Sequence, residues 1–100
     1  MARRLRNEYI ICYDIEENRN RSRIFKELEK HGLKPVQKSV FWGYLSSAEL
    51  EAVKRYLLKH ISQKTDKALI TRTNINAICG GFTIGYRSTD FEDWDETYVI

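Results

Sequence analysis

A single aspartate interrupts an apolar segment near the start of the chain, where residues 9–15 read YIICYDI. Burying an ionised carboxylate is costly unless a partner compensates its charge. We therefore expect Asp14 to lie at an exposed strand end, to begin a turn or cap the following helix, or to bind a cation. Mg²⁺ sites commonly use one or two carboxylates and keep several waters. One chain offers one well-placed carboxylate for such a site, that of Asp14.

Three arginines follow at a spacing of two, Arg19, Arg21 and Arg23. No single helix face can display all three. A loop leading into a helix N-terminus can nevertheless gather phosphates through guanidinium groups and free amides. These arginines are therefore candidate nucleic-acid contacts, with an ordinary solvated helix start as the alternative.

A second group of candidates lies in the later sequence QKSVF, which contains Lys38, Ser39 and Phe41. Lys38 is a candidate phosphate contact. The Ser39 hydroxyl could bind a phosphate oxygen or a metal-bound water, and a tight sheet or dimer contact is an equal alternative. Phe41 fits the apolar core of a dimer interface better than it fits a base-stacking platform.

The elements that position these residues follow from the hydrophobic periodicity. A strand over residues 9–15 leads through polar turn residues into a helix at roughly 20–31, which Gly32 ends. Residues 35–45 alternate as a strand does. Ser46 and Glu49 form a capping box for a second helix at about 47–61. Further strands are expected at 66–73, 80–86 and 97–100.

This arrangement predicts an α+β fold of the ferredoxin-like type, βαββαβ with an antiparallel sheet, both helices on one face and a short extra C-terminal strand. Apolar residues point to both faces of the first strand, with Ile11 on one face and Ile10 on the other. Two helices can cover only one face. A second copy is the economical cover for the other face, so we expect a homodimer with Phe41 or Trp42 at its interface.

Composition limits the alternatives. One hundred residues, 42% of them hydrophobic, suit a single domain over 1–100. The segment MARRLR is followed by charge, which favours a cytoplasmic protein with no membrane segment, and residues 1–7 are expected to form a basic arm. Residues 1–89 carry all 17 Lys and Arg against 9 acids, whereas residues 88–100 form an acidic loop and terminal strand. The basic body favours a polyanionic partner.

The segment YIICYDI, the arginine-rich turn NRNRSR and above all VQKSVFWGYLSSAEL resemble the small CRISPR-associated family that stands second in the numbered Cas series. The resemblance covers residues 8 to about 75. It implies a homodimer with its two aspartates close together, a Mg²⁺-dependent endonuclease activity on RNA or DNA, and a scaffold role beside the CRISPR integrase. Mn²⁺ is an alternative cation. By motif position, Asp14 is the metal-associated residue, and Arg21, Arg23, Ser39 and Phe41 match positions linked to catalysis.

Other function classes remain open at this stage. A non-catalytic dimeric scaffold would bind duplex DNA through Arg19, Arg21, Arg23 and Lys38 without any need for Asp14. A toxin-type ribonuclease is a related alternative. A regulatory domain for a small ligand is less favoured, because the sequence has no glycine-rich phosphate loop. The preference for RNA or DNA and the role of Trp94 do not follow from the sequence.

Overall fold

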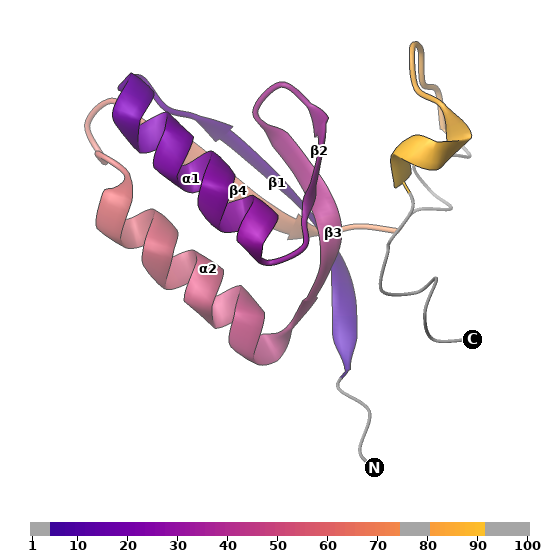
Figure 1. Cartoon of the computed structure of the whole chain (residues 1–100), viewed down its shortest axis with the longest axis horizontal. Coiled ribbons are helices and arrows are strands. Elements are labelled where there is room, and N and C mark those ends of the chain that lie inside the picture. The colour runs from indigo at the N-terminus through magenta and orange to yellow at the C-terminus, as the bar shows by residue number, and fades with distance from the viewer. Residues whose placement is uncertain (1–4, 75–80, 92–100) are drawn as a thin grey trace.

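The computed structural model describes residues 5–74 and 81–91, and two helices cover one face of a four-stranded antiparallel sheet (Figure 1). The strand order in the sheet is β2-β3-β1-β4. The element sequence βαββαβ confirms the ferredoxin-like prediction. The elements are β1 (Arg6–Asp14), α1 (Asn18–Lys30), β2 (Lys34–Gln37), β3 (Val40–Ser46), α2 (Ser47–His60), β4 (Lys67–Arg72) and a short 3₁₀ helix, η1 (Ser88–Phe91).

The central β-hairpin is the first difference from the sequence prediction, which treated residues 35–45 as one strand. β2 and β3 pair as antiparallel neighbours with Gln37 opposite Val40, so that Lys38 and Ser39 form the turn. Ser39 adopts a positive φ of 62°. A sequence of Lys and Ser lacks the Asn-Gly type of signal that marks a tight hairpin, which is why the turn was not predicted.

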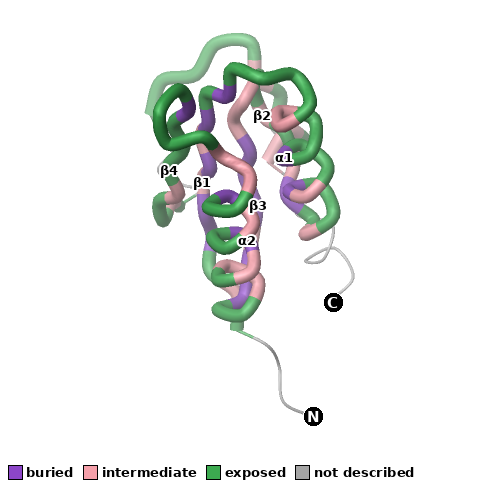
Figure 2. The backbone as a smooth tube through the Cα atoms, turned by 90° about the vertical axis from the view of Figure 1, so that its left-hand side faces the viewer, coloured by how far each residue is buried: buried purple, intermediate pink, exposed green. Residues whose placement is uncertain are grey.

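The hydrophobic core lies between the sheet and the two helices, and Figure 2 shows buried residues along β1, β3 and the inner sides of both helices. Alternate residues of β1 point into this layer, as their period of two requires. Ile24 and Leu28 supply the contacts from α1, and Val53 and Leu57 those from α2. The core side chains are Tyr9, Ile11, Tyr13, Ile15, Ile24, Leu28, Leu33, Phe41, Leu45, Val53 and Leu57.

The starts of the two helices are stabilised differently, and only that of α2 has a local cap. The predicted capping box of α2 is present: Glu49 N donates to Ser46 Oγ at 3.2 Å, and Ser46 N donates to Glu49 Oε1 at 2.8 Å. The residue that precedes α1, Glu17, makes no side-chain cap. Asp14 therefore does not cap this helix. The backbone just before α1 is instead held by Asp66 of the α2–β4 connection, which accepts a hydrogen bond from Glu16 N.

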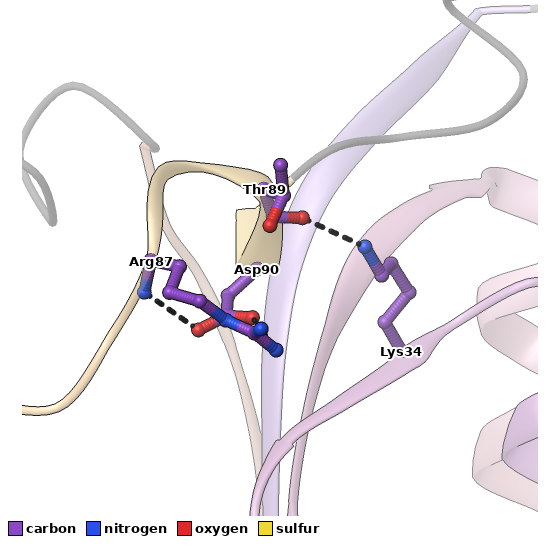
Figure 3. Close-up of polar contacts among 4 residues, drawn as sticks. All are labelled: Lys34, Arg87, Thr89 and Asp90. Atoms are coloured by element: carbon purple, nitrogen blue, oxygen red, sulfur yellow. Dashed lines mark hydrogen bonds and ion pairs between the residues drawn. The ribbon is translucent and has the colours of Figure 1, made fainter.

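The open face of the sheet, defined here as the face opposite the helices, is covered in part by the chain itself. Phe91 of η1 packs edge-on against Trp42 at 5.6 Å between ring centroids. Lys34 Nζ donates to the Thr89 carbonyl at 3.2 Å, and Arg87 and Asp90 tie the segment together (Figure 3). Trp42 is only 1% exposed as a result. Trp42, which was expected at a dimer interface, is therefore covered by its own chain.

Two further predictions about the ends of the chain change. Residues 81–86 form bends rather than the predicted strand, and Phe82 and Ile84 are 87% and 78% exposed. The basic arm was expected to include residues 6 and 7, which belong to β1. The predicted strand at 97–100, Trp94 and Cys79 lie outside the described residues. No helix in the described ranges is long and apolar enough to cross a membrane.

Candidate functional site

One end of the sheet gathers most of the candidate residues. Asp14 is the last residue of β1 and pairs with Lys67, the first residue of β4. Tyr13 N donates to the Ser39 carbonyl at 3.1 Å, which holds the β2–β3 turn beside the end of β1. The N-terminus of α1 begins at Asn18, only four residues beyond Asp14. Antiparallel pairing therefore brings residues from four elements to this end.

Asp14 is exposed there, as the first sequence alternative proposed. Among the described residues, no hydrogen bond or ion pair engages its carboxylate, and it does not reach the Lys67 ammonium directly opposite. An unengaged carboxylate can accept a cation or a proton-bearing partner. The site at this point therefore has an available anionic ligand with a cationic side chain on the neighbouring strand.

The donor set near Asp14 fits a metal ion only as part of a larger site. Within residues 5–74 and 81–91, no three His, Cys, Asp or Glu side chains lie close enough together to hold a metal ion. Mg²⁺ accepts one or two carboxylates with waters filling the remaining positions. Asp14 of one chain could therefore supply one of the carboxylates that such an ion accepts.

Arg21 is held in a defined position beside the strand end. Its guanidinium donates to the Ile15 carbonyl at 2.8 Å and to Asn18 Oδ1. These contacts leave other N–H donors of the planar group for a phosphate. Burial raises the pKa of the Tyr13 hydroxyl above 10.0, and the nearby Arg21 charge partly opposes that shift. Tyr13 therefore stays protonated near neutral pH, as a neutral hydroxyl beside a fixed cation.

Arg19 and Arg23 lie on a different side of α1 from Arg21, as their spacing predicted. They are four residues apart and therefore share a helix face, and both are exposed. The guanidinium of Arg23 approaches Asn20 Oδ1 at 3.5 Å. The three arginines consequently form two groups, one directed at the strand end and one at solvent.

Ser39 and Lys38 form the tip of the β2–β3 hairpin, next to a groove of about 570 Å³ that α1 borders on its other side. Arg21 and Tyr13 line the same groove. The sequence candidates Arg21, Lys38 and Ser39 are thus neighbours in space, although they come from separate elements.

Phe41 is not part of this exposed group. Its side chain is completely buried on the helix side of the sheet, where the Tyr13 ring stacks at 6.2 Å and the Phe25 ring packs edge-on at 5.1 Å. With no exposed area, Phe41 has nothing to offer a base or a second copy. The expectation of an interface position for Phe41 was wrong; any effect of Phe41 on activity would act through the rings it contacts, Tyr13 and Phe25.

The residue that organises the start of α1 was missed in the sequence. Asp66 Oδ1 accepts from Glu16 N at 3.0 Å, and Asp66 Oδ2 accepts from Ser62 N at 3.0 Å. These backbone hydrogen bonds hold the pKa of the Asp66 carboxyl below its ordinary value of 3.8. Asp66 therefore fixes the β1–α1 connection that carries Asp14, across fifty residues of sequence that no local pattern spans.

Two cations were also missed, Lys67 beside Asp14 and Lys26 in the groove. The register of β4 could have identified Lys67, because an antiparallel pairing of DKALI with the end of YIICYD places the two residues opposite each other. The fold prediction contained no register, so this signal was not used.

Comparisons with known proteins agree with this architecture. Residues 7–77 match the family model described as CRISPR associated protein Cas2. A CRISPR-associated endoribonuclease Cas2 of Francisella tularensis subsp. novicida is 50% identical over 92 residues, which cover 92% of this chain and 94% of the relative. The Cas2 structure from Streptococcus pyogenes superposes with a TM-score of 0.67 at 24% identity, covering 78% of this chain and 99% of that one. A chain of a partial Cas6-RT-Cas1–Cas2 complex gives a TM-score of 0.60 at 23% identity, covering 78% and 90%.

Proposed function

This chain belongs to the CRISPR-associated Cas2 family, and we propose that it is a homodimeric, Mg²⁺-dependent nuclease of CRISPR spacer acquisition that also binds nucleic acid beside the integrase. The single observation that carries the proposal is the exposed, unengaged Asp14 carboxylate at a sheet end that also carries Lys67 and Arg21. The name of the 50% identical relative, an endoribonuclease, supports RNA as the cleaved substrate.

In this proposal the anionic residue Asp14 binds the cation, and the cationic residues Arg21 and Lys67 bind the substrate. Two copies of Asp14 would hold one cation between them. When bound, Mg²⁺ supplies a polarised phosphate and a more acidic water. Arg21 is positioned to hold the same phosphate by paired N–H donors, because its other contacts already fix its plane. Lys67 adds a second positive charge beside the Asp14 carboxylate. This charge would favour the binding of an anionic substrate.

The open face supports the dimer. Ile10, Cys12 and Val40 are half-buried there, and Leu69, opposite Cys12 in the register, is 54% exposed. A second copy placed on this patch would bring the ends of both β1 strands toward each other, as a shared cation requires. A complex with an integrase is proposed from the assembly that the Cas1–Cas2 structural neighbour represents.

A non-catalytic scaffold is the second candidate, and the exposed Arg19 and Arg23 on one side of α1 favour it. They could neutralise successive phosphates of a duplex without any cation at Asp14.

Cleavage assays on RNA and DNA, with Mg²⁺ or with EDTA, test the nuclease proposal and separate the two candidates. We expect cleavage only with Mg²⁺, and Asp14→Asn should lower its rate by about a hundredfold or more. The control is Glu17→Gln. Glu17 is a nearby exposed carboxylate whose side chain does not cap α1, so this variant should cleave as the wild type does. Duplex affinity should persist or increase in Asp14→Asn, because two negative charges leave the phosphate path.

Wild-type cleavage by Asp14→Asn would refute the metal site. Absence of cleavage in both proteins, with duplex binding in both, would instead make the scaffold the primary function.

A further inference from the structure

The groove between α1 and the β2–β3 hairpin is lined by cationic and aromatic side chains. The proposed function assigns a phosphate contact to Arg21 but gives no role to the aromatic ring or to Lys26. The groove's volume of about 570 Å³ falls within the range of small-ligand sites. Arg21, Lys26 and Lys38 line it, and no acidic residue does. The groove is therefore electrostatically suited to an anion.

One wall of the groove is apolar. Phe25 is 36% exposed as a residue, and the edge-on contact of its ring with the buried Phe41 at 5.1 Å holds that ring in place. Pro35 and Val36 of β2 line the groove with it. A fixed, partly exposed aromatic ring beside aliphatic groups offers a stacking surface for a nucleobase.

The other large groove of the described chain lacks this combination. It lies between α2 and β4, has a volume of about 610 Å³, and is lined mainly by leucine and isoleucine side chains. Lys54 and Lys67 are accompanied there by the carboxylate of Asp66, and no aromatic ring is present. Of these two grooves, the one at α1 offers a base surface and phosphate contacts together.

We propose that the α1–hairpin groove binds one nucleotide of a single-stranded nucleic acid, with the base against Phe25 and the flanking phosphates at Arg21, Lys26 and Lys38. The fixed guanidinium of Arg21 would set the position of one phosphate. The hairpin tip lies beside the end of β1, so the groove is close to the strand end that carries Asp14. This inference rests on the proposed nucleic-acid function and adds a single-strand subsite to it.

Fluorescence anisotropy with three probes tests the proposal: a single-stranded oligonucleotide, an abasic strand of equal length, and a duplex. Wild-type protein should prefer the base-containing strand to the abasic strand by about fivefold or more. Phe25→Leu, which keeps an apolar side chain, should remove that preference and leave abasic and duplex binding unchanged. Lys26→Ala should weaken binding of both single strands more than Lys30→Ala does, a lysine four residues further along α1 and outside the groove.

Equal affinity of the wild type for base-containing and abasic strands would overturn the proposed subsite. If the protein still bound the duplex, the proposed function would stand without the subsite. A preference that Phe25→Leu retains would overturn it too. Absence of binding to all three probes at low salt would overturn both proposals. Binding of an acidic peptide that Lys26→Ala weakens, together with no base preference among the oligonucleotides, would assign the groove to a protein segment instead.

Discussion

Asp66 is the residue that ties the β1–α1 connection, which follows Asp14, to the α2–β4 connection. Its two carboxylate oxygens accept backbone N–H groups from the β1–α1 connection and from the start of the α2–β4 connection, and Thr65 Oγ1 adds a third donor at 3.1 Å. A carboxylate that joins two loops in this way replaces the side-chain cap that α1 lacks.

We therefore expect Asp66→Ala to lower the melting temperature by several degrees at neutral pH, because backbone donors lose their acceptor. The lowered pKa of Asp66 means that its contribution is present above the unfolded value of about 3.8 and is lost as the pH falls through the folded value. The stability difference between wild type and variant should be constant from pH 7 to about pH 5 and shrink below pH 4. Thermal unfolding across this range measures it, and a difference that grows on acidification would contradict the assignment.

A second buried carboxylate stabilises the open face rather than the site. Glu8 accepts from Trp42 Nε1 at 2.8 Å and from the Tyr44 hydroxyl at 3.3 Å. Trp42 is thus fixed by Glu8 on one side and by Phe91 on the other. A charged substitution at Trp42 or Phe41 would disrupt the core of one subunit, so neither residue is a suitable probe of the dimer.

At the scale of elements, the β2–β3 hairpin is the part of the site under the greatest local constraint. A positive φ costs a non-glycine residue about 1–2 kcal/mol, and Ser39 accepts that cost with its carbonyl engaged by Tyr13 N. Because the conformation and the hydroxyl are separate properties, substitutions at this position can tell a structural serine from a functional one.

Ser39→Gly should keep the free energy of unfolding within about 1 kcal/mol of the wild type, whereas Ser39→Val should lower it by about 1–2 kcal/mol. Denaturant unfolding measures both. If the Ser39 hydroxyl contacts substrate or a metal-bound water, Ser39→Gly will lose cleavage without losing stability. Full cleavage by Ser39→Gly would assign the serine to the turn alone.

The elements show which parts of the molecule the sequence could specify. The second helix was predicted at 47–61 and is found at Ser47–His60, because the capping box is a local signal. The hairpin was missed, since its turn depends on a serine in a conformation that serine seldom adopts. The strand predicted at 80–86 followed an alternation whose apolar members, Phe82 and Ile84, are exposed. Local sequence patterns identified the elements whose ends have strong signals. They failed where the structure depends on the conformation of a turn or on a packing partner.

The candidate site shows the same limit. The exposure of Asp14 was one of three alternatives that the sequence offered, and the division of the arginines followed from their spacing. Lys67, Lys26 and Asp66 reach this end of the sheet only through strand register and loop packing, which depend on contacts between residues far apart in the chain.

At the scale of the whole molecule, the dimer is the assumption on which a metal site depends. The open-face patch of Ile10, Cys12, Val40 and Leu69 is the surface proposed for it. Leu69→Glu should weaken dimerisation by at least about tenfold, because it places a charge where an apolar contact would form. The melting temperature should change little, since Leu69 is already 54% exposed.

Leu58→Glu is the matched control, because Leu58 is 70% exposed on α2, in the helix layer. Sedimentation velocity at micromolar concentration should give about twice the chain mass of 11.9 kDa for the wild type and for Leu58→Glu. A wild type that sediments as a monomer would remove the support for both the dimer and the shared cation.

The most direct test of the shared site is a subunit-mixing experiment. Wild-type and Asp14→Asn proteins are mixed in varying proportion at constant total concentration, allowed to exchange subunits, and assayed for Mg²⁺-dependent cleavage. If one cation needs both Asp14 carboxylates, mixed dimers are inactive, and an equal mixture retains about one quarter of the wild-type rate. Mixtures with Glu17→Gln should retain full activity. A rate that falls in direct proportion to the wild-type fraction, with about one half left in the equal mixture, would mean that each chain cleaves with its own Asp14 and would contradict the shared site.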